Sequence, residues 1–350
     1  MKFLGFTALI LLLTYPIYSQ ESANKTSNYI EEELCFVNRG DTLYGKLVVP
    51  KTIRNKAPVI VFVHGSGPED YSSSDNYRYL WEEFTKAGFA CFSWDRPGVG
   101  LSQGNWFDIS IDERANEVIN AIKMLKLNSK VDTLNIGLWG ISQAGWVIPK
   151  VACVISPAFV ISVSAPVTTA FDQEIYRLRS ELSKDGFSTN AIDSAINYTA
   201  AVRKAVLDGK EFAAFDSIQQ LINEHKWSSY VLTGGKELYQ YLNVILKDDH
   251  VPDLGCLKCP ILSIWGENDL LVPPNSSADK YNEVMRNMGN IKARIEIIPD
   301  ADHTLTYNTT GRRQETIERR NNYRDQPELI FARGYVELMV NWLKALNISD

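Results

Sequence analysis

The chain has 350 residues, 45% of them hydrophobic, which is enough to bury a large core and to form one to three domains. Its formal net charge of −6 argues against nucleic acid or an anionic membrane surface as a partner.

The N-terminus has the pattern of a secretory signal peptide over residues 1–19. Lys2 is followed by an apolar run from Phe3 to Leu13 and by a small residue at Ser19. This run is shorter than the about 20 apolar residues that a membrane-spanning helix needs. We therefore expect a secreted or periplasmic mature chain with no membrane contact after cleavage, preceded by a flexible polar leader over residues 20–30.

Between residues 31 and 166 short apolar strands alternate with amphipathic helices. The expected strands are Glu33–Val37 and Thr42–Val49, which form a hairpin, then Ala57–Val63, Phe89–Trp94, Thr133–Trp139 and Phe159–Ser164. The expected helices are Asn76–Ala87, Ile111–Leu127 and Gln143–Cys153. This alternation predicts an α/β fold with a mainly parallel sheet flanked by helices, in which ligands bind at the carboxyl ends of the strands.

The alternation stops over residues 167–254, where four successive amphipathic stripes predict a helical cap. It resumes over residues 255–350 with strands Ile261–Trp265 and Ala293–Ile298 and helices Ser276–Asn290 and Tyr335–Leu346. The charged stretch 312–325 is expected to face solvent. We expect a core of residues 31–166 and 255–350, with the cap inserted between its halves.

Five cysteines are present, at positions 35, 91, 153, 256 and 259. Because their number is odd and three lie in apolar runs, we predict buried thiols and no disulfide framework. Cys256 and Cys259 have the spacing of a redox pair, but Pro260 and a strand follow them where a reactive thiol needs a helix terminus. Neither a redox site nor a zinc site is favoured.

A candidate nucleophile, Ser142, lies at the switch from a strand to a helix, in Gly140-Ile-Ser-Gln-Ala-Gly145. Small residues around a serine allow the tight turn that raises the serine oxygen above the sheet. The common form of the motif is G-x-S-x-G, whereas here Ala144 takes the place of the last glycine. Alone, this short motif is equally compatible with a glycine-rich loop and an idle serine.

A serine nucleophile needs a base, and the chain has four histidines. His64 belongs to a glycine-rich loop that it is expected to brace. His225 and His250 fall in the cap without a surrounding turn motif. His303 follows a predicted strand and is our candidate base.

The carboxylate that orients the base is expected after another strand. Asp269, in Gly266-Glu-Asn-Asp269, is our candidate, with Glu267 as the fallback and Asp300 or Asp302 as weaker alternatives. Each of these residues can also be an ordinary loop residue that caps a helix or a turn, but three candidates in this order, each after a strand, favour a catalytic triad.

Acyl transfer also needs donors for an oxyanion hole. The expected donors are the backbone N–H groups of Ser66, in the loop His64-Gly-Ser-Gly67, and of Gln143. The stretch Asp95-Arg-Pro-Gly98 is expected to form a structural turn beneath them.

Five motifs together resemble the α/β-hydrolase superfamily. They are His64-Gly-Ser-Gly-Pro68, Asp95-Arg-Pro-Gly-Val-Gly-Leu-Ser102, Leu138-Trp-Gly-Ile-Ser-Gln-Ala-Gly-Trp146, Gly266-Glu-Asn-Asp269 and Asp302-His303. More narrowly, they resemble its secreted bacterial esterases and prolyl-peptidase-like relatives with an H-G-S-G-P loop. The resemblance implies hydrolysis of a small-molecule carboxylic ester through an acyl-enzyme, with Ser142, Asp269 and His303 as the triad and no cofactor or metal.

Two other functions stay open at this point. A peptidase could use the same three residues on an amide, although no cluster that would grip a free amino terminus is evident. A catalytically silent fold could bind a ligand or partner protein, although such proteins usually lose a triad member. The physiological substrate and the oligomeric state do not follow from the sequence.

Overall fold

The computed structural model describes residues 27–348 except 54, 223, 248–250 and 291. The predicted signal peptide lies outside the described residues, as does most of the predicted leader. The end of that leader is assigned wrongly, because Tyr29 and Ile30 already belong to the first strand. They pair with Pro50 and Val49 of the second strand.

One eight-stranded sheet forms the centre of the described part of the chain, in the order β1-β2-β4-β3-β5-β6-β7-β8. The strands are β1 (Tyr29–Asn38), β2 (Asp41–Pro50), β3 (Ala57–Val63), β4 (Ala90–Trp94), β5 (Val131–Ile141), β6 (Val160–Val163), β7 (Ile261–Gly266) and β8 (Ala293–Ile298). Strand β2 runs antiparallel to β1 and β4, and the other neighbours are parallel. The predicted α/β fold with a mainly parallel sheet is confirmed.

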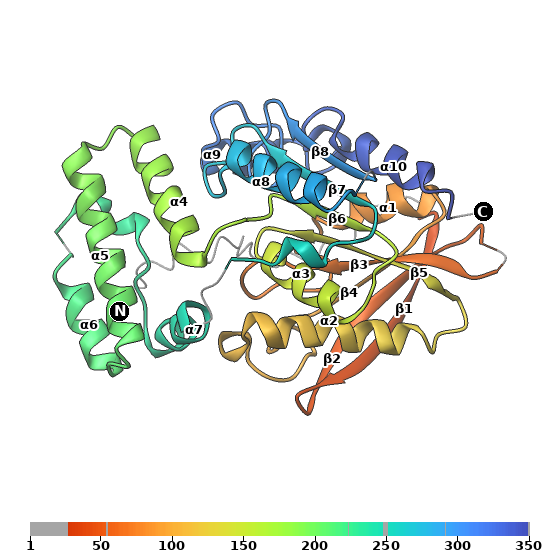
Figure 1. The fold of residues 1–350 in the computed structure, drawn as a ribbon, viewed down its shortest axis with the longest axis horizontal. Coiled ribbons are helices and arrows are strands. Elements are labelled where there is room, and N and C mark those ends of the chain that lie inside the picture. The colour runs from red at the N-terminus through yellow and green to blue at the C-terminus, as the bar shows by residue number, and fades with distance from the viewer. Residues whose placement is uncertain (1–26, 54, 223, 248–250, 291, 349–350) are drawn as a thin grey trace.

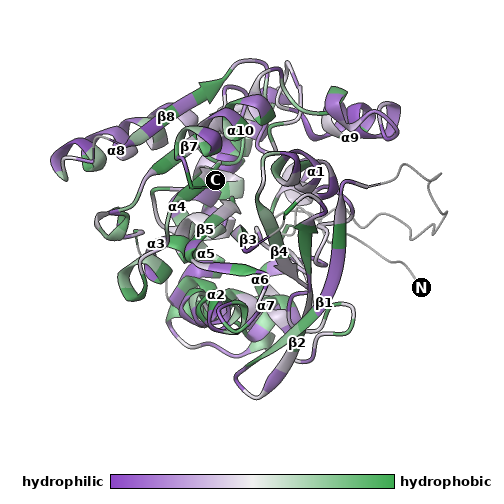
Figure 2. Ribbon diagram, turned by 90° about the vertical axis from the view of Figure 1, so that its right-hand side faces the viewer, coloured by the Kyte–Doolittle hydropathy of each residue, from purple (hydrophilic) through white to green (hydrophobic). Residues whose placement is uncertain are grey.

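Helices cover both faces of this sheet (Figure 1). Helices α1 (Arg78–Lys86) and α10 (Tyr335–Ala345) pack on one face, and α2 (Ile111–Leu125), α3 (Ala144–Val154) and α8 (Pro274–Asn287) pack on the other. Central strands such as β3 are buried along their whole length, as their unbroken apolar sequences require. In Figure 2 these strands carry hydrophobic colour, whereas helix α9 (Arg313–Asn322) is almost wholly hydrophilic.

The register of the parallel strands brings the predicted motifs to one edge of the sheet. Val63 lies opposite Gly140, and Ile141 lies opposite Val163. Gly266 lies opposite Ile298, farther along the sheet. The loops that begin at residues 64, 142, 267 and 299 therefore leave the sheet at the same edge.

In their described part, the residues between β6 and β7 form four α-helices, two short 3-10 helices and no strand. The α-helices are α4 (Ala170–Lys184), α5 (Thr189–Leu207), α6 (Phe212–Gln220) and α7 (Lys236–Lys247). Figure 1 shows them grouped beside the sheet, with α7 nearest the core. Thr169 and Ser188 cap the N-termini of helices α4 and α5, because their hydroxyls accept hydrogen bonds from backbone N–H groups of the first turn. None of the helices in the described part is long and apolar enough to cross a membrane.

The expectation that the cysteines remain free thiols is wrong for one pair. Cys153, near the end of α3, and Cys256, where the chain returns from the cap, form a disulfide with 4.9 Å between their Cα atoms. Cys256 and Cys259 therefore do not form a redox pair. The partners are 103 residues apart, so the motif around Cys256 could not reveal the bond.

The stretch 312–325 is exposed or half-exposed, as predicted, at every residue but one. It contains helix α9, and the Arg320 side chain of this helix is buried. The interactions that bury it come from a distant loop, as described below.

Candidate active site

Ser142 lies in a tight turn between β5 and α3. Its φ is 56°, in the left-handed region that a non-glycine residue adopts at a cost of about 1–3 kcal/mol. The Ser142 N–H donates to the carbonyl oxygen of Val163 at 2.9 Å, and the Ser142 carbonyl accepts from the Gly145 N–H at 2.8 Å. The surrounding backbone thus fixes Ser142 in this conformation, as a nucleophile elbow requires.

The small residues around Ser142 are needed because the turn brings atoms close together. A Cβ atom at Gly140 would lie 2.6 Å from the Cβ of Ala144, and one at Gly145 would lie 2.6 Å from the Cβ of Ala165. Ala144 itself is fully buried in the turn. The departure from G-x-S-x-G is therefore accommodated, because a methyl group fits at position 144 as long as position 140 has none.

His303 and Asp269 are brought together from two loops. The Nδ1 of His303 lies 2.8 Å from the Oδ2 of Asp269. The other carboxylate oxygen, Oδ1, accepts from the N–H groups of Leu271 and Val272 at 2.8 and 2.9 Å. Because a carboxylate only accepts, Nδ1 of His303 carries the proton and Nε2 is left as the basic nitrogen.

This pairing also sets the proton affinity of His303. Burial lowers the pKa of His303, but the charge of Asp269 and its hydrogen bond outweigh burial, so the pKa is raised above 6.5. The imidazole side chain is only 12% exposed. The pair can therefore hold a proton on the imidazole during a reaction step.

The other carboxylates considered for orienting His303 have different hydrogen-bond partners. Glu267 and Asp300 are exposed, and the N–H of Asp300 donates to Glu267 at 3.4 Å. Asp302 is buried, but its Oδ1 accepts from the Thr304 N–H and hydroxyl at 2.7 and 2.8 Å. Asp302 thus shapes the loop that carries His303, and its charge adds to that of Asp269 in raising the pKa of His303.

The remaining histidines are separate from this site. His225 is exposed on the cap, stacked on Trp227, and His250 lies outside the described residues. His64 is buried, with Nε2 at 2.6 Å from the carbonyl oxygen of Trp94 and Nδ1 at 3.1 Å from the Tyr77 hydroxyl. Burial lowers the pKa of His64 to about 3, so this histidine stays neutral and braces its loop.

The candidate oxyanion donors, Ser66 and Gln143, are linked to each other through the cap. Within the described residues no hydrogen bond occupies the backbone N–H of Ser66 or of Gln143. The Gln143 side chain accepts from Arg114 through Oε1 and donates to the Tyr241 hydroxyl through Nε2 at 3.0 Å. The same Tyr241 hydroxyl is hydrogen-bonded to the Ser66 hydroxyl at 3.0 Å. Tyr241 of cap helix α7 therefore links the two residues that would bind an oxyanion.

Two buried arginines support the loop that carries Ser66. Arg114 donates to the His64 carbonyl at 2.5 Å, and Arg96, from the predicted turn, donates to the Gly67 carbonyl at 2.7 Å. Burial, and then the like charge of Arg96, lowers the pKa of Arg114 to about 9, which leaves it charged near neutral pH. Sequence reasoning placed Arg96 in a structural turn but missed Arg114 and Tyr241, which no motif surrounds.

A cavity of about 150 Å³ contains the candidate catalytic groups. Ser142, His303, Ser66 and Gln143 all line it, while Asp269 lies behind His303, fully buried. Apolar walls come from Trp139, Trp146 and Leu271 and from Ile245 of the cap. The candidate serine, the histidine–carboxylate pair and the two residues with backbone donors thus meet at one cavity, which cap helix α7 helps to enclose.

Comparisons with known proteins find a matching family and a shared fold. The sequence model of the family described as "Alpha/beta hydrolase family" matches residues 60–316. A curated relative, the bifunctional esterase/perhydrolase DCH of Acinetobacter calcoaceticus, is 24% identical over 238 residues, which cover 66% of this chain and 81% of the relative.

Two solved structures share the fold. The Pyrococcus furiosus esterase Pf2001 has a TM-score of 0.58 and 14% identity, covering 95% of this chain and 98% of its own. Est1E from Butyrivibrio proteoclasticus, solved with ferulic acid, has a TM-score of 0.51 and 15% identity, covering 90% and 98%.

Proposed function

The chain belongs to the alpha/beta hydrolase family, and we propose that it hydrolyses a small carboxylic ester through an acyl-enzyme on Ser142. One observation carries this proposal. A serine in a strained turn shares a cavity with a histidine whose Nδ1 is hydrogen-bonded to a buried carboxylate. The curated relative that is named an esterase supports an ester as the substrate class.

In the acylation step, the Oγ of Ser142 attacks the ester carbonyl carbon while Nε2 of His303 takes the hydroxyl proton. The carbonyl oxygen becomes an oxyanion, which accepts hydrogen bonds from the N–H groups of Ser66 and Gln143. Asp269 holds the imidazole by its Nδ1–H and stabilises the imidazolium. The tetrahedral intermediate then breaks its bond to the alcohol oxygen, which leaves with the proton from His303.

In the deacylation step, a water molecule gives its proton to Nε2 of His303 and attacks the acyl carbon. The second tetrahedral intermediate then breaks its bond to the Oγ of Ser142, which takes the proton from His303, and the carboxylic acid leaves. This chemistry needs only groups of the chain, so no metal or cofactor enters the proposal. We also propose that residues 1–19 direct secretion, so that the mature enzyme acts outside the cytoplasm.

Hydrolysis of p-nitrophenyl esters from acetyl to octanoyl tests the proposal, with the mature chain and two serine variants. Ser142→Ala is expected to lower kcat at least about 10⁴-fold, because the nucleophile is lost. Ser164→Ala is the matched control: Ser164 directly follows β6 and has a φ of 47°, but it does not line the cavity.

Equal turnover by the wild-type chain and Ser142→Ala would refute the serine mechanism. A folded protein that hydrolyses no ester but cleaves peptide p-nitroanilides would replace the esterase by a peptidase.

A further inference from the structure

The cavity has a polar wall that the proposed catalytic steps do not use. Its members share one feature, a side chain that hydrogen-bonds as donor or acceptor. They are Glu69, Ser73, Ser74, Asn76, Thr304 and Arg320. A cavity that bound only an acyl chain would be lined by apolar side chains, whereas this wall presents polar side chains to the substrate.

The loop that carries half of this wall has an unusual backbone. Ser73, Ser74 and Asp75 have φ values of 51°, 52° and 68°, so three successive non-glycine residues are left-handed. Such conformations persist only where other contacts fix them, and they concentrate at binding sites.

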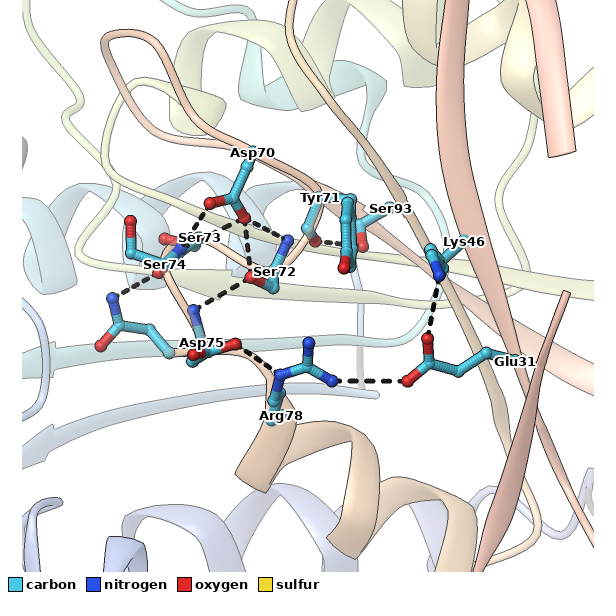
Figure 3. Close-up of polar contacts among 11 residues, drawn as sticks. Glu31, Lys46, Asp70, Tyr71, Ser72, Ser73, Ser74, Asp75, Arg78 and Ser93 are labelled. Atoms are coloured by element: carbon cyan, nitrogen blue, oxygen red, sulfur yellow. Dashed lines mark hydrogen bonds and ion pairs between the residues drawn. The ribbon is translucent and has the colours of Figure 1, made fainter. Parts of the chain in front are cut away.

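Asp70 and Arg78, which do not line the cavity, supply several of those contacts (Figure 3). The Asp70 carboxylate accepts from the Ser72 N–H and hydroxyl, both at 2.7 Å, and from the Ser74 N–H at 3.2 Å. Arg78 pairs with Asp75 at 2.5 Å and with Glu31 of β1 at 3.4 Å. Figure 3 shows how Asp70 and Arg78 hold the serine turn from two sides.

The opposite end of the wall comes from helix α9. The Arg320 guanidinium donates to the Thr306 hydroxyl at 3.1 and 3.3 Å and to the Asn76 side-chain oxygen. The Asn76 amide in turn donates to the Ser73 carbonyl at 2.5 Å. Hydrogen bonds therefore connect the serine turn, Arg320 and the loop that carries His303 into one preorganised wall.

The position of this wall identifies the part of the ester that it contacts. Thr304 follows His303 in the chain, and Arg320 is bonded to Thr306 of the same loop. His303 donates its proton to the leaving alcohol, so the alcohol must lie on the side of His303. The polar wall is therefore placed to contact the alcohol part.

The charges of Glu69 and Arg320 favour neutral over charged polar groups on the substrate. A substrate carboxylate would meet Glu69, and a substrate ammonium group would meet Arg320. Burial raises the pKa of Glu69 to about 7, so near neutral pH its carboxyl group can either accept or donate. A hydroxyl group can donate to a carboxylate and accept from a guanidinium, and so can use both ends.

We propose that this polar wall is a subsite for a neutral, hydroxyl-rich alcohol, such as a sugar or polyol, whose ester the enzyme hydrolyses. This inference rests on the proposed function and names its substrate class. A site that offers donors and acceptors to hydroxyl groups favours an ester that carries them over an analogue without them.

The test compares two acetates that share an acetoxymethyl group on a saturated six-membered ring, methyl 6-O-acetyl-β-D-glucopyranoside and cyclohexylmethyl acetate. The wild-type chain is expected to favour the sugar ester at least about 100-fold in kcat/KM. Arg320→Met and Glu69→Gln are each expected to lower this ratio at least about tenfold. Because the readout is a ratio, a general loss of active protein does not move it. Arg319→Met is the matched control, a neighbouring arginine that does not line the cavity and is expected to keep the wild-type ratio.

A wild-type ratio near one, or unchanged ratios in both variants, would overturn the subsite while leaving the esterase proposal intact. Binding of both acetates to the Ser142→Ala protein, followed by ligand-detected NMR, is independent of turnover. At least about tenfold tighter binding of the sugar ester is expected there, and equal binding would overturn the subsite even if no ester were hydrolysed.

Discussion

Replacing Tyr241 by phenylalanine removes one oxygen atom from cap helix α7 and two hydrogen bonds from the candidate oxyanion hole. The Tyr241 hydroxyl lies 3.0 Å from the Ser66 hydroxyl and 3.0 Å from the Gln143 Nε2. The ring would stay in place, because it is buried against Trp106 and Phe107. The substitution therefore separates positioning of the two oxyanion residues from packing of the cap.

The expected losses in stability and in kcat follow from the two hydrogen bonds that Tyr241→Phe removes. Each net hydrogen bond contributes about 0.5–1.5 kcal/mol to stability, so Tyr241→Phe is expected to lower the free energy of unfolding by about 1–3 kcal/mol. Losing an oxyanion donor outright lowers kcat by about 10²–10³-fold. Tyr241 acts only on the side chains of the two donor residues, so we expect a smaller loss in kcat, about tenfold or about 1.4 kcal/mol, with KM little changed.

The assay is steady-state hydrolysis of p-nitrophenyl acetate together with urea unfolding. Tyr239→Phe is the matched control, because Tyr239 lies in the same helix and its hydroxyl donates to the Lys210 carbonyl, away from the cavity. Since this hydroxyl makes one hydrogen bond, Tyr239→Phe is expected to lower the free energy of unfolding by about 0.5–1.5 kcal/mol and to keep the wild-type kcat. If Tyr241→Phe also keeps that kcat, the cap does not position the oxyanion residues and the reasoning fails.

Three further predictions concern the pH profile and the stability of the fold. His303 must be neutral to act as the base, and its pKa is raised above 6.5. We therefore expect kcat/KM for p-nitrophenyl acetate to fall as pH decreases and to reach half its maximum above pH 6.5. A rate independent of pH between about 5 and 8 would contradict the assignment of His303 as the base. Cys153→Ser opens the disulfide and is expected to lower the free energy of unfolding by about 2–5 kcal/mol in urea titrations, whereas Cys35→Ser, at an exposed thiol, serves as the control. Gly266→Ala places a Cβ atom 2.2 and 2.4 Å from backbone carbonyl oxygens, so it is expected to lower the free energy of unfolding in urea titrations by about 1–3 kcal/mol or more. Gly235→Ala is the control, because its Cβ atom would have nothing within 4 Å, and it is expected to lower that free energy by less than about 1 kcal/mol.

The fold could be predicted because its information is local. Each central strand is a short apolar run, such as Ala57–Val63, whose predicted and observed bounds agree. Because parallel strands end at one edge, the residues that follow them could be grouped before any contact was known. The hydrogen bond between Asp269 and His303 lies where this argument expected it.

The features that could not be predicted depend on contacts between distant segments. Helix α9 is so polar that its own sequence gives no sign of a buried face, and Arg320 is buried through Asn76, 244 residues away. Tyr241 looks like an ordinary apolar residue of the cap until its hydroxyl is placed between Ser66 and Gln143. Such side chains satisfy their hydrogen bonds through tertiary packing, which neither spacing nor composition encodes.

The most direct test of the proposed mechanism is covalent labelling of the mature chain with a fluorophosphonate, followed by peptide mass spectrometry. The reagent phosphonylates an activated serine, so we expect one adduct per chain on the peptide that contains Ser142. Labelling is expected to disappear in Ser142→Ala and to slow at least about 10³-fold in His303→Ala, since the base no longer takes the hydroxyl proton. An adduct on another serine, or equal labelling rates in the wild-type chain and His303→Ala, would contradict a serine nucleophile activated by His303.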